Sequence, residues 1–272
     1  MSDDVVLLDI KDPGIAVLTL NRPERLNAWT GAMSARYFQR LDECEADDAV
    51  KVVVVTGAGR GYCAGADMDN LAAAGKGGGV GAASGDSPVA SADPRDVWET
   101  TKVTKPVIAA INGACAGIGL VQTLMCDLRF AAAGAKFTTA FSRRGLIAEY
   151  GISWALPRLV GTANALDLLM SGRVFLAEEA KAMGMVNDVV PGDELLDHVL
   201  RYAADVAVNA CPTSMAVMKR QVYADAFRAL PESSDAAVEL MKASLKRPDF
   251  VEGVQSFLQR RPPAFAPVVK DA

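Results

Sequence analysis

The sequence predicts an α/β fold, and two stretches carry most of that prediction. Residues 52–67 read VVVVTGAGRGYCAGAD, and residues 110–127 read AINGACAGIGLVQTLMCD. Each stretch passes from an apolar, strand-like run through glycines and small residues into a helix-like pattern. A strand that ends at small residues leaves backbone N–H groups open to a ligand. Two such ends side by side can direct two N–H donors at one oxygen, which is how an oxyanion hole is built.

The first 56 residues predict a hairpin, a helix and a buried strand. Residues 5–10 and 14–20 flank a Lys-Asp-Pro-Gly turn signal and are typical of a hairpin. Apolar residues at helical spacing predict an amphipathic helix over residues 31–46. The run at residues 51–56 predicts a buried strand, which leads into the first glycine segment.

Residues 73–94 interrupt this pattern with six glycines and few apolar anchors. A short helix is expected directly after Asp67, before this stretch. Strand and helix patterns resume on both sides, so we expect a surface loop and not a linker between domains. Two interpretations remain open, a lid over the site and a disordered insertion.

The pattern then repeats and becomes helical. Residues 106–111, 128–132 and 135–139 predict strands, and residues 117–126 predict a helix. From residue 153 onward the pattern is mostly helical, with stripes of Met, Leu and Phe in the last part. We therefore expect a core over residues 1–210 and a helical region over residues 211–272.

Composition excludes several classes of protein. The 272-residue chain has a net charge of −5 and an isoelectric point near 5.1, which argues against nucleic-acid binding. No apolar run approaches the roughly 20 residues of a membrane span, and the acidic start lacks the layout of a signal peptide. The five cysteines are an odd number without metal-ligand spacing, so we expect reduced thiols, no metal and a cytoplasmic location.

The chain has one histidine, His198, on a predicted helix. A structural or solvated role is the plain expectation. Catalysis that needs paired histidines is excluded, and a Ser-His-Asp triad would have to recruit this one residue.

Four segments carry a family resemblance. They are LTLNRPERLNAW at 18–29, CAGAD at 63–67, NGACAGIGL at 112–120 and EGVQSFLQRR at 252–261. Together, in this order, they resemble the crotonase family, the enoyl-CoA hydratase/isomerase superfamily. The resemblance implies a spiral of ββα repeats with a C-terminal helical region that forms trimers, which pair into hexamers. It also implies an acyl-CoA thioester as substrate and no separate cofactor.

The resemblance also assigns site residues. The N–H groups of Ala64 and Ile118 are expected to bind the thioester oxygen. The rim of the CoA pocket is expected at Arg25, Leu26 and Ala28. The other residues that it assigns to the substrate site are Gly65, Ala66, Asp67, Gly117, Val121, Phe141, Phe257 and Arg260. Asp67 is expected to fix the turn, and Phe257 and Arg260 to reach the CoA of a neighbouring subunit. Arg260 could equally be a solvated helix end.

The residues expected to act as acid and base differ from those of the family's hydratases. Hydratases of the family use two glutamates, and the matching positions hold Val121 and Phe141. Glu149, eight residues beyond Phe141, matches an acidic position of other branches. An apolar pocket would raise its pKa and suit it to proton shuttling. The alternative is a structural ion pair with Arg143 or Arg144.

One carboxylate suits double-bond migration somewhat better than water addition. The broad expectation is an enzyme of the enoyl-CoA hydratase/isomerase type. Alternatives are a non-catalytic acyl-CoA binder on the same fold, or a hydrolase, decarboxylase or lyase of the family. A remote alternative is an NAD(P)-binding short-chain dehydrogenase, which VVVVTGAGRG also resembles.

Overall fold

A six-stranded sheet forms the core of the computed structural model, which describes residues 4–69, 72 and 92–269. The strand order is β1-β2-β3-β5-β7-β10, and every neighbouring pair is parallel except the β1–β2 hairpin. The bounds are Val6–Lys11 (β1), Ile15–Leu20 (β2), Val52–Gly57 (β3), Val107–Ile111 (β5), Leu128–Ala132 (β7) and Asp188–Val190 (β10). The two central strands β3 and β5 are buried throughout, as their continuous apolar runs predict.

A smaller sheet follows the first along the chain. Its order is β4-β6-β8-β9, with bounds Gly61–Cys63 (β4), Ala114–Ala116 (β6), Lys136–Thr138 (β8) and Phe175–Leu176 (β9). The strands β3, β5 and β7 of the first sheet are each followed within a few residues by a strand of the second. The chain therefore advances in strand–strand units and winds as a spiral, so the expected α/β fold is confirmed.

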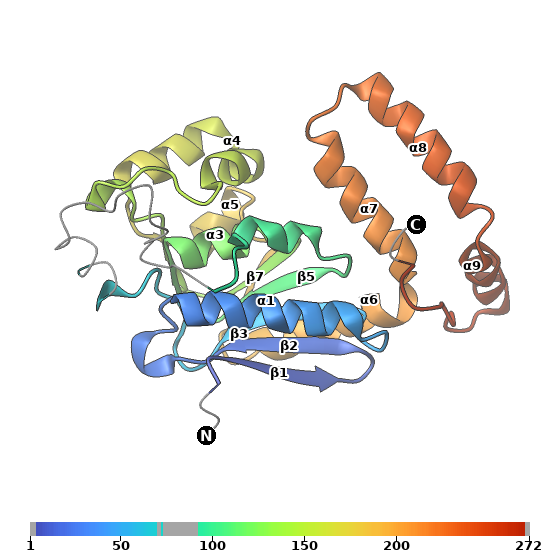
Figure 1. Ribbon diagram of the computed structural model, residues 1–272, viewed down its shortest axis with the longest axis horizontal. Coiled ribbons are helices and arrows are strands. Elements are labelled where there is room, and N and C mark those ends of the chain that lie inside the picture. Colours follow the sequence, from blue (N-terminus) through green and yellow to red (C-terminus); the bar gives the residue numbers. More distant parts are fainter. Residues whose placement is uncertain (1–3, 70–71, 73–91, 270–272) are drawn as a thin grey trace.

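Helices cover these sheets (Figure 1). The amphipathic helix α1 (Gly31–Ala46) begins after Thr30, whose side chain accepts a hydrogen bond from the Met33 N–H at 3.2 Å. Helix α3 (Ile118–Leu124) packs on β4 and β6, and α6 (Leu195–Asn209) packs on the six-stranded sheet. The other core elements are α4 (Ile152–Ser171), α5 (Ala177–Ala182), and the 3-10 helices η1 (Pro23–Arg25), η2 (Val97–Lys102) and η3 (Ser142–Arg144).

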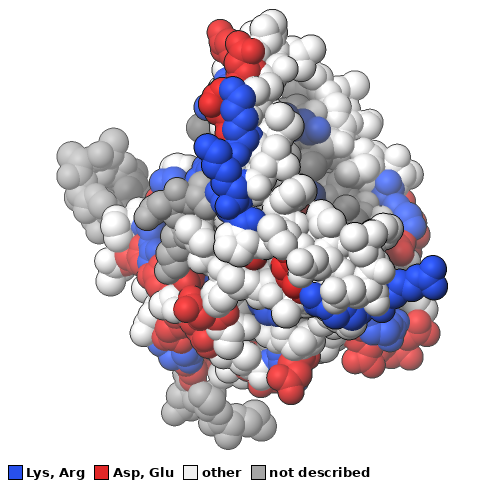
Figure 2. All heavy atoms as spheres, turned by 90° about the vertical axis from the view of Figure 1, so that its right-hand side faces the viewer, with Lys and Arg blue, Asp and Glu red and all other residues white. Residues whose placement is uncertain are grey.

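Three C-terminal helices extend from this core (Figure 1). We call them the C-terminal arm; they are α7 (Pro212–Asp225), α8 (Leu230–Ser244) and α9 (Pro248–Gln259). The arm carries large exposed apolar side chains; Leu230 and Phe257 are each 82% exposed. Figure 2 looks onto the side where the arm lies, and broad uncharged areas adjoin a column of basic side chains there. The division at residue 210 stays a prediction.

Some expectations fall outside the described residues. Only residues 92–94 of the expected loop 73–94 are described, and the helix expected after Asp67 falls largely on residues that are not. No helix in the described ranges is long and apolar enough to cross a membrane.

Candidate active site

The two glycine segments meet where β4 and β6 end. Gly65 and Gly117 both have positive φ angles, of 100° and 51°. A Cβ added at Gly65 would lie 3.2 Å from the Ala116 carbonyl oxygen, and one at Gly117 would lie 3.7 Å from the Gly65 Cα. A Cβ at Gly119 would lie 2.6 Å from the Cys63 carbonyl oxygen. Glycine is therefore required at this junction, because larger residues would push the two segments apart.

The Ala64 N–H already donates a hydrogen bond within the protein. It donates to the Leu26 carbonyl at 3.0 Å. A donor engaged by a backbone carbonyl is not available to a thioester oxygen, so the expectation that Ala64 supplies a donor is wrong for this structure. The same bond fastens the rim segment, in which Leu26 lies, to the first glycine segment.

Ala66 offers the donor instead. It forms an isolated parallel bridge with Trp29, in which the Trp29 N–H donates to Gly65 at 2.7 Å and the Asp67 N–H donates to Trp29 at 3.0 Å. In such a bridge the N–H of the central residue points away from its partner strand. The second glycine segment lies next to this one, since a Cβ on Gly65 would meet the Ala116 carbonyl oxygen. Among the described residues the Ala66 N–H has no protein acceptor.

Ile118 provides a second open donor. It is the first residue of α3, so its N–H has no partner within the helix. The preceding Gly117 N–H donates to the Thr138 carbonyl at 3.1 Å, which fixes the turn, and in the described part of the chain no acceptor faces the Ile118 N–H. The Ile118 side chain is buried in the core, so the unusual residue type leaves the backbone group unaffected.

Apolar side chains occupy the positions of the usual glutamates. Val121 is fully buried on α3, and Phe141 is buried before η3. Neither can transfer a proton. Both belong to the hydrophobic core, and their expected place in the substrate site stays a prediction.

Glu149 is half-buried, and burial raises the pKa of its carboxyl. The nearby arginines have other acceptors, since Arg143 donates to the Ser171 carbonyl at 2.8 Å and Arg144 to the Ala140 carbonyl at 3.2 Å. Neither forms an ion pair with Glu149 in the described ranges. Glu149 immediately precedes Tyr150 and Gly151, which both have positive φ angles, so the chain turns sharply directly after it.

An ion pair between Arg22 and Asp67 supports the first glycine segment. The two side chains lie 2.9 Å apart, and Arg22 also donates to the Ala28 carbonyl at 2.6 Å. Burial opposes the charged form of Asp67, but the hydrogen bonds from Arg22 and the Asp69 N–H, together with the positive charges of Arg22 and Arg25, outweigh it and lower the pKa of Asp67. Asn27 adds a second connection between the rim segment and the first glycine segment, because its side chain donates to the carbonyls of Ala58 and Gly61. Sequence reasoning missed Arg22 and Asn27; their position inside the first resembling segment was the available signal.

The remaining expected residues are placed as follows. Arg25 is exposed and pairs with Asp69 at 2.9 Å, at the edge of the rim segment. Phe257 and Arg260 lie on the C-terminal arm, away from the glycine segments of the same chain (Figure 1). Their expected contact with a neighbouring subunit stays a prediction. His198 is half-buried, with its ring 5.5 Å from that of Phe130, which fits a structural role.

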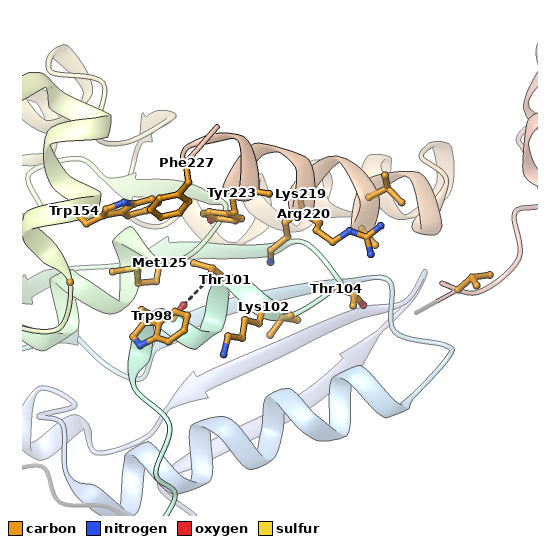
Figure 3. A pocket seen from close by; sticks show the side chains of 16 residues that line it. Trp98, Thr101, Lys102, Thr104, Met125, Trp154, Lys219, Arg220, Tyr223 and Phe227 are labelled. Carbon is orange, nitrogen blue, oxygen red and sulfur yellow. Dashed lines mark hydrogen bonds between the residues drawn. The ribbon is translucent and has the colours of Figure 1, made fainter. Parts of the chain in front are cut away.

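A separate cavity of about 610 Å³ lies between α7 and the core (Figure 3). Aromatic and apolar side chains form its walls, and basic side chains lie at its edge. Trp154 stacks on Phe227 with ring centroids 5.8 Å apart. Ala66, Ile118 and Glu149 are not among its lining residues. The sequence did not predict this cavity, and in the described ranges no cluster of side chains could hold a metal ion.

Comparisons with known proteins identify the family of this chain. The profile of the enoyl-CoA hydratase/isomerase family matches residues 11–267. A 1,2-epoxyphenylacetyl-CoA isomerase from Escherichia coli is 36% identical over 95% of this chain and 97% of its own length. A probable enoyl-CoA hydratase/isomerase structure from Mycobacterium abscessus superposes with a TM-score of 0.86 at 31% identity, covering 96% of this chain and 98% of that one. An enoyl-CoA hydratase structure from Mycobacterium marinum is 50% identical, with a TM-score of 0.70, over 83% of this chain and 100% of that one.

The fold and its paired glycine segments thus define a crotonase-type enzyme. By its sequence match along nearly the whole length, the chain belongs to the enoyl-CoA hydratase/isomerase family. This membership replaces the dehydrogenase interpretation of residues 52–61.

Proposed function

We propose that this protein acts on acyl-CoA thioesters by stabilising an enolate, with the thioester oxygen bound by the N–H groups of Ala66 and Ile118. The observation that carries the proposal is the pair of open backbone donors at one junction, where a Cβ on Gly117 would already be in van der Waals contact with Gly65. Two such donors stabilise the negative charge that develops on a carbonyl oxygen when a neighbouring carbon loses a proton.

Glu149 is the proposed acid/base. Its carboxylate takes a proton from a carbon of the acyl chain, and the electron pair moves onto the thioester oxygen. The resulting carboxylic acid returns the proton at a different carbon, so the double bond migrates with no net change in atoms or electrons. Partial burial and a raised pKa support this assignment, because they bring the group closer to neutral pH.

Isomerisation is favoured over hydration by the residues at the other two positions. Val121 and Phe141 cannot hold or activate a water molecule, which leaves one carboxylate for the whole reaction. The Escherichia coli relative is named a 1,2-epoxyphenylacetyl-CoA isomerase, whereas other relatives are named enoyl-CoA hydratases, so the names include both kinds of reaction on CoA thioesters. No cofactor is required, since coenzyme A is part of the substrate.

The test combines product identification with Glu149→Gln. Wild-type protein is incubated with enoyl-CoA esters whose double bond lies at different positions, and products are separated by mass and by retention. We expect migration of the double bond, and we expect Glu149→Gln to lower kcat about 100-fold or more with little change in CoA-ester affinity. Glu194→Gln, an exposed carboxyl outside the site, is the matched control and should retain activity. Wild-type kcat in Glu149→Gln would refute the assignment.

Loss of both usual glutamates also favours a second candidate, a non-catalytic acyl-CoA binder. Binding of several acyl-CoA esters by calorimetry without turnover of any would support it. The same product identification distinguishes a hydrolase, a decarboxylase or a lyase of the family.

We also propose a homotrimer or hexamer assembled through the C-terminal arm, and a cytoplasmic location. The exposed apolar side chains of α7, α8 and α9 support the assembly. All five cysteines are free thiols, which supports a reducing compartment.

A further inference from the structure

A chain of buried hydrogen bonds runs beneath the candidate site. The Tyr62 hydroxyl donates to Gln122 Oε1 at 2.5 Å, and Gln122 Nε2 donates to the Tyr37 hydroxyl at 2.9 Å. The Tyr37 hydroxyl in turn lies 3.0 Å from Thr100 Oγ1. All four side chains are fully buried. Burial raises the pKa of Tyr62 and of Tyr37, so both hydroxyls remain protonated.

One end of this chain joins α3, which begins at Ile118, to β4, which ends three residues before Ala66. Tyr62 lies in β4, four residues before Ala66, and Gln122 lies one helical turn after Ile118 in α3. Across the described residues, theirs is the one side-chain hydrogen bond between β4 and α3. The other end, Tyr37 and Thr100, connects α1 to η2 and does not reach β4.

We propose that Tyr62 and Gln122 are positioning residues that hold the Ala66 and Ile118 N–H groups at the spacing needed to bind one oxygen. The inference rests on the proposed oxyanion hole. Two donors from different elements converge on one atom only if those elements keep a fixed relative register. The packing of Gly119 on Cys63 sets how closely α3 approaches β4, but apolar contact alone tolerates sliding. A directional hydrogen bond between fully buried side chains restricts sliding along the contact.

The competing explanation is that the bond only satisfies buried polar groups. Removing one hydroxyl from such a network destabilises a protein in either case, because its partner is left unpaired. The two ends of the chain separate the explanations. Tyr62→Phe removes the link between β4 and α3, while Tyr37→Phe removes a buried hydroxyl of the same kind whose hydrogen bonds in the described structure go to Thr100 and Gln122 and not to β4.

The first experiment measures kinetics of these two variants on the best enoyl-CoA substrate, with thermal unfolding followed in parallel. We expect Tyr62→Phe to lower kcat about tenfold with KM changed less than threefold, since part of the oxyanion stabilisation is lost. Tyr37→Phe should keep kcat within twofold at a similar loss of melting temperature. Equal loss of kcat in both variants, or in neither, would overturn the inference.

A double variant provides an independent check. Tyr62→Phe with Gln122→Met removes both partners of the β4–α3 bond, so no polar group is left unpaired between them. We expect the melting temperature to recover relative to Tyr62→Phe while kcat stays low. Recovery of both would mean that the bond serves stability alone.

The spectroscopic experiment needs no turnover. Crotonyl-CoA labelled with ¹³C at the thioester carbonyl is bound to Glu149→Gln protein, and its infrared carbonyl stretch is compared with that in water. We expect a shift to lower frequency, reduced by at least half when Tyr62→Phe is added and kept when Tyr37→Phe is added. If Tyr62→Phe does not fold, Gln122→Met replaces it in this measurement with the same expectation.

The outcomes distinguish this inference from the proposed function. No shift in the parent protein would refute the oxyanion hole and the inference with it. A shift that Tyr62→Phe and Gln122→Met leave unchanged would refute the inference alone.

Discussion

Burial of the Glu149 carboxyl destabilises the folded protein at neutral pH, and this loss of stability can be measured. Burial raises its folded pKa above the 4.5 of an exposed glutamate. The stability associated with a raised carboxyl pKa is present at low pH and is lost as pH rises through the folded pKa. At neutral pH the ionised side chain therefore destabilises the fold. We expect Glu149→Gln to raise the melting temperature at pH 7 although it lowers kcat, and we expect this gain in melting temperature to disappear in acid, where both side chains are uncharged.

The same carboxyl sets the acid limb of the pH–rate profile. A base must be ionised to take a proton, so kcat should fall as pH drops through the pKa of Glu149, with a midpoint above 4.5. Rates measured from pH 4 to pH 8 give this midpoint. The residual rate of Glu149→Gln should not show this fall in kcat at low pH. A flat profile in the wild-type protein would contradict the assignment of Glu149 as base.

Asp67 has the opposite linkage. Its ion pair with Arg22 lowers its folded pKa, so its stabilisation is present at neutral pH and is lost as pH falls through that lowered pKa. We expect Asp67→Asn to lower the free energy of unfolding by about 1–3 kcal/mol at pH 7. Denaturant titrations at pH 7 and at pH 3 should give a smaller difference from wild type at the lower pH. Asp69→Asn, which removes an exposed pair, is the control and should cost little.

Residue types alone could not identify which backbone N–H is open. The sequence predicts that the CAGAD segment supplies a donor, but Ala64 and Ala66 would direct their N–H groups to the same side of a regular extended segment, and the positive φ angle of Gly65 breaks that regularity. The choice between Ala64 and Ala66 depends on contacts with Leu26 and Trp29, which lie more than 30 residues earlier in the chain. Glu149 was predictable because it is the carboxyl nearest an expected position, whereas its lack of an arginine partner depends on where Ser171 and Ala140 fall.

At the scale of elements, the close contact between α3 and β4 predicts that a larger residue at Gly119 will disturb both elements. Gly119 has ordinary helical geometry, so alanine is conformationally acceptable there, but its Cβ would collide with the Cys63 carbonyl oxygen and sulfur. We expect Gly119→Ala to shift α3, to lower the melting temperature and to reduce kcat at least tenfold. Gly192→Ala is the matched control, because its Cβ would meet only the Ala132 methyl at 3.7 Å. Equal behaviour of the two variants would contradict the tight α3–β4 junction.

Elements with long, regular patterns were predictable from the sequence; of the short strands, β8 was predicted but β9 and β10 were not. The apolar face of α1 and the continuous runs of β3 and β5 match the structure to within a residue or so. The strands β9 and β10 have two and three residues, too short for a period to emerge. They exist because β8 and β7 offer them partners, which is a property of the assembled sheets.

The whole molecule exposes more apolar surface on its C-terminal arm than an isolated chain would keep in water. On α7, Met218 and Val222 are 62% and 71% exposed, and on α9 Phe257 is 82% exposed. A neighbouring copy that covers these side chains would remove them from water, and a closed ring of copies would let the arm of one reach the site of another. The family resemblance predicts a trimer or a pair of trimers.

Light scattering at micromolar concentration tests this assembly. We expect a mass of about three or six times 28.6 kDa. Replacing both Met218 and Val222 with Asp should shift the mass toward 28.6 kDa, because charged side chains cannot be buried unpaired in a subunit contact. Ile10→Asp, on the exposed outer strand β1, is the control and should leave the mass unchanged.

If the arm also contributes to the acyl-CoA site, the dissociated variant should bind CoA esters more weakly while each chain stays folded. A wild-type protein that scatters as a single chain would refute the assembly, and Phe257 and Arg260 would then have no neighbouring site to serve.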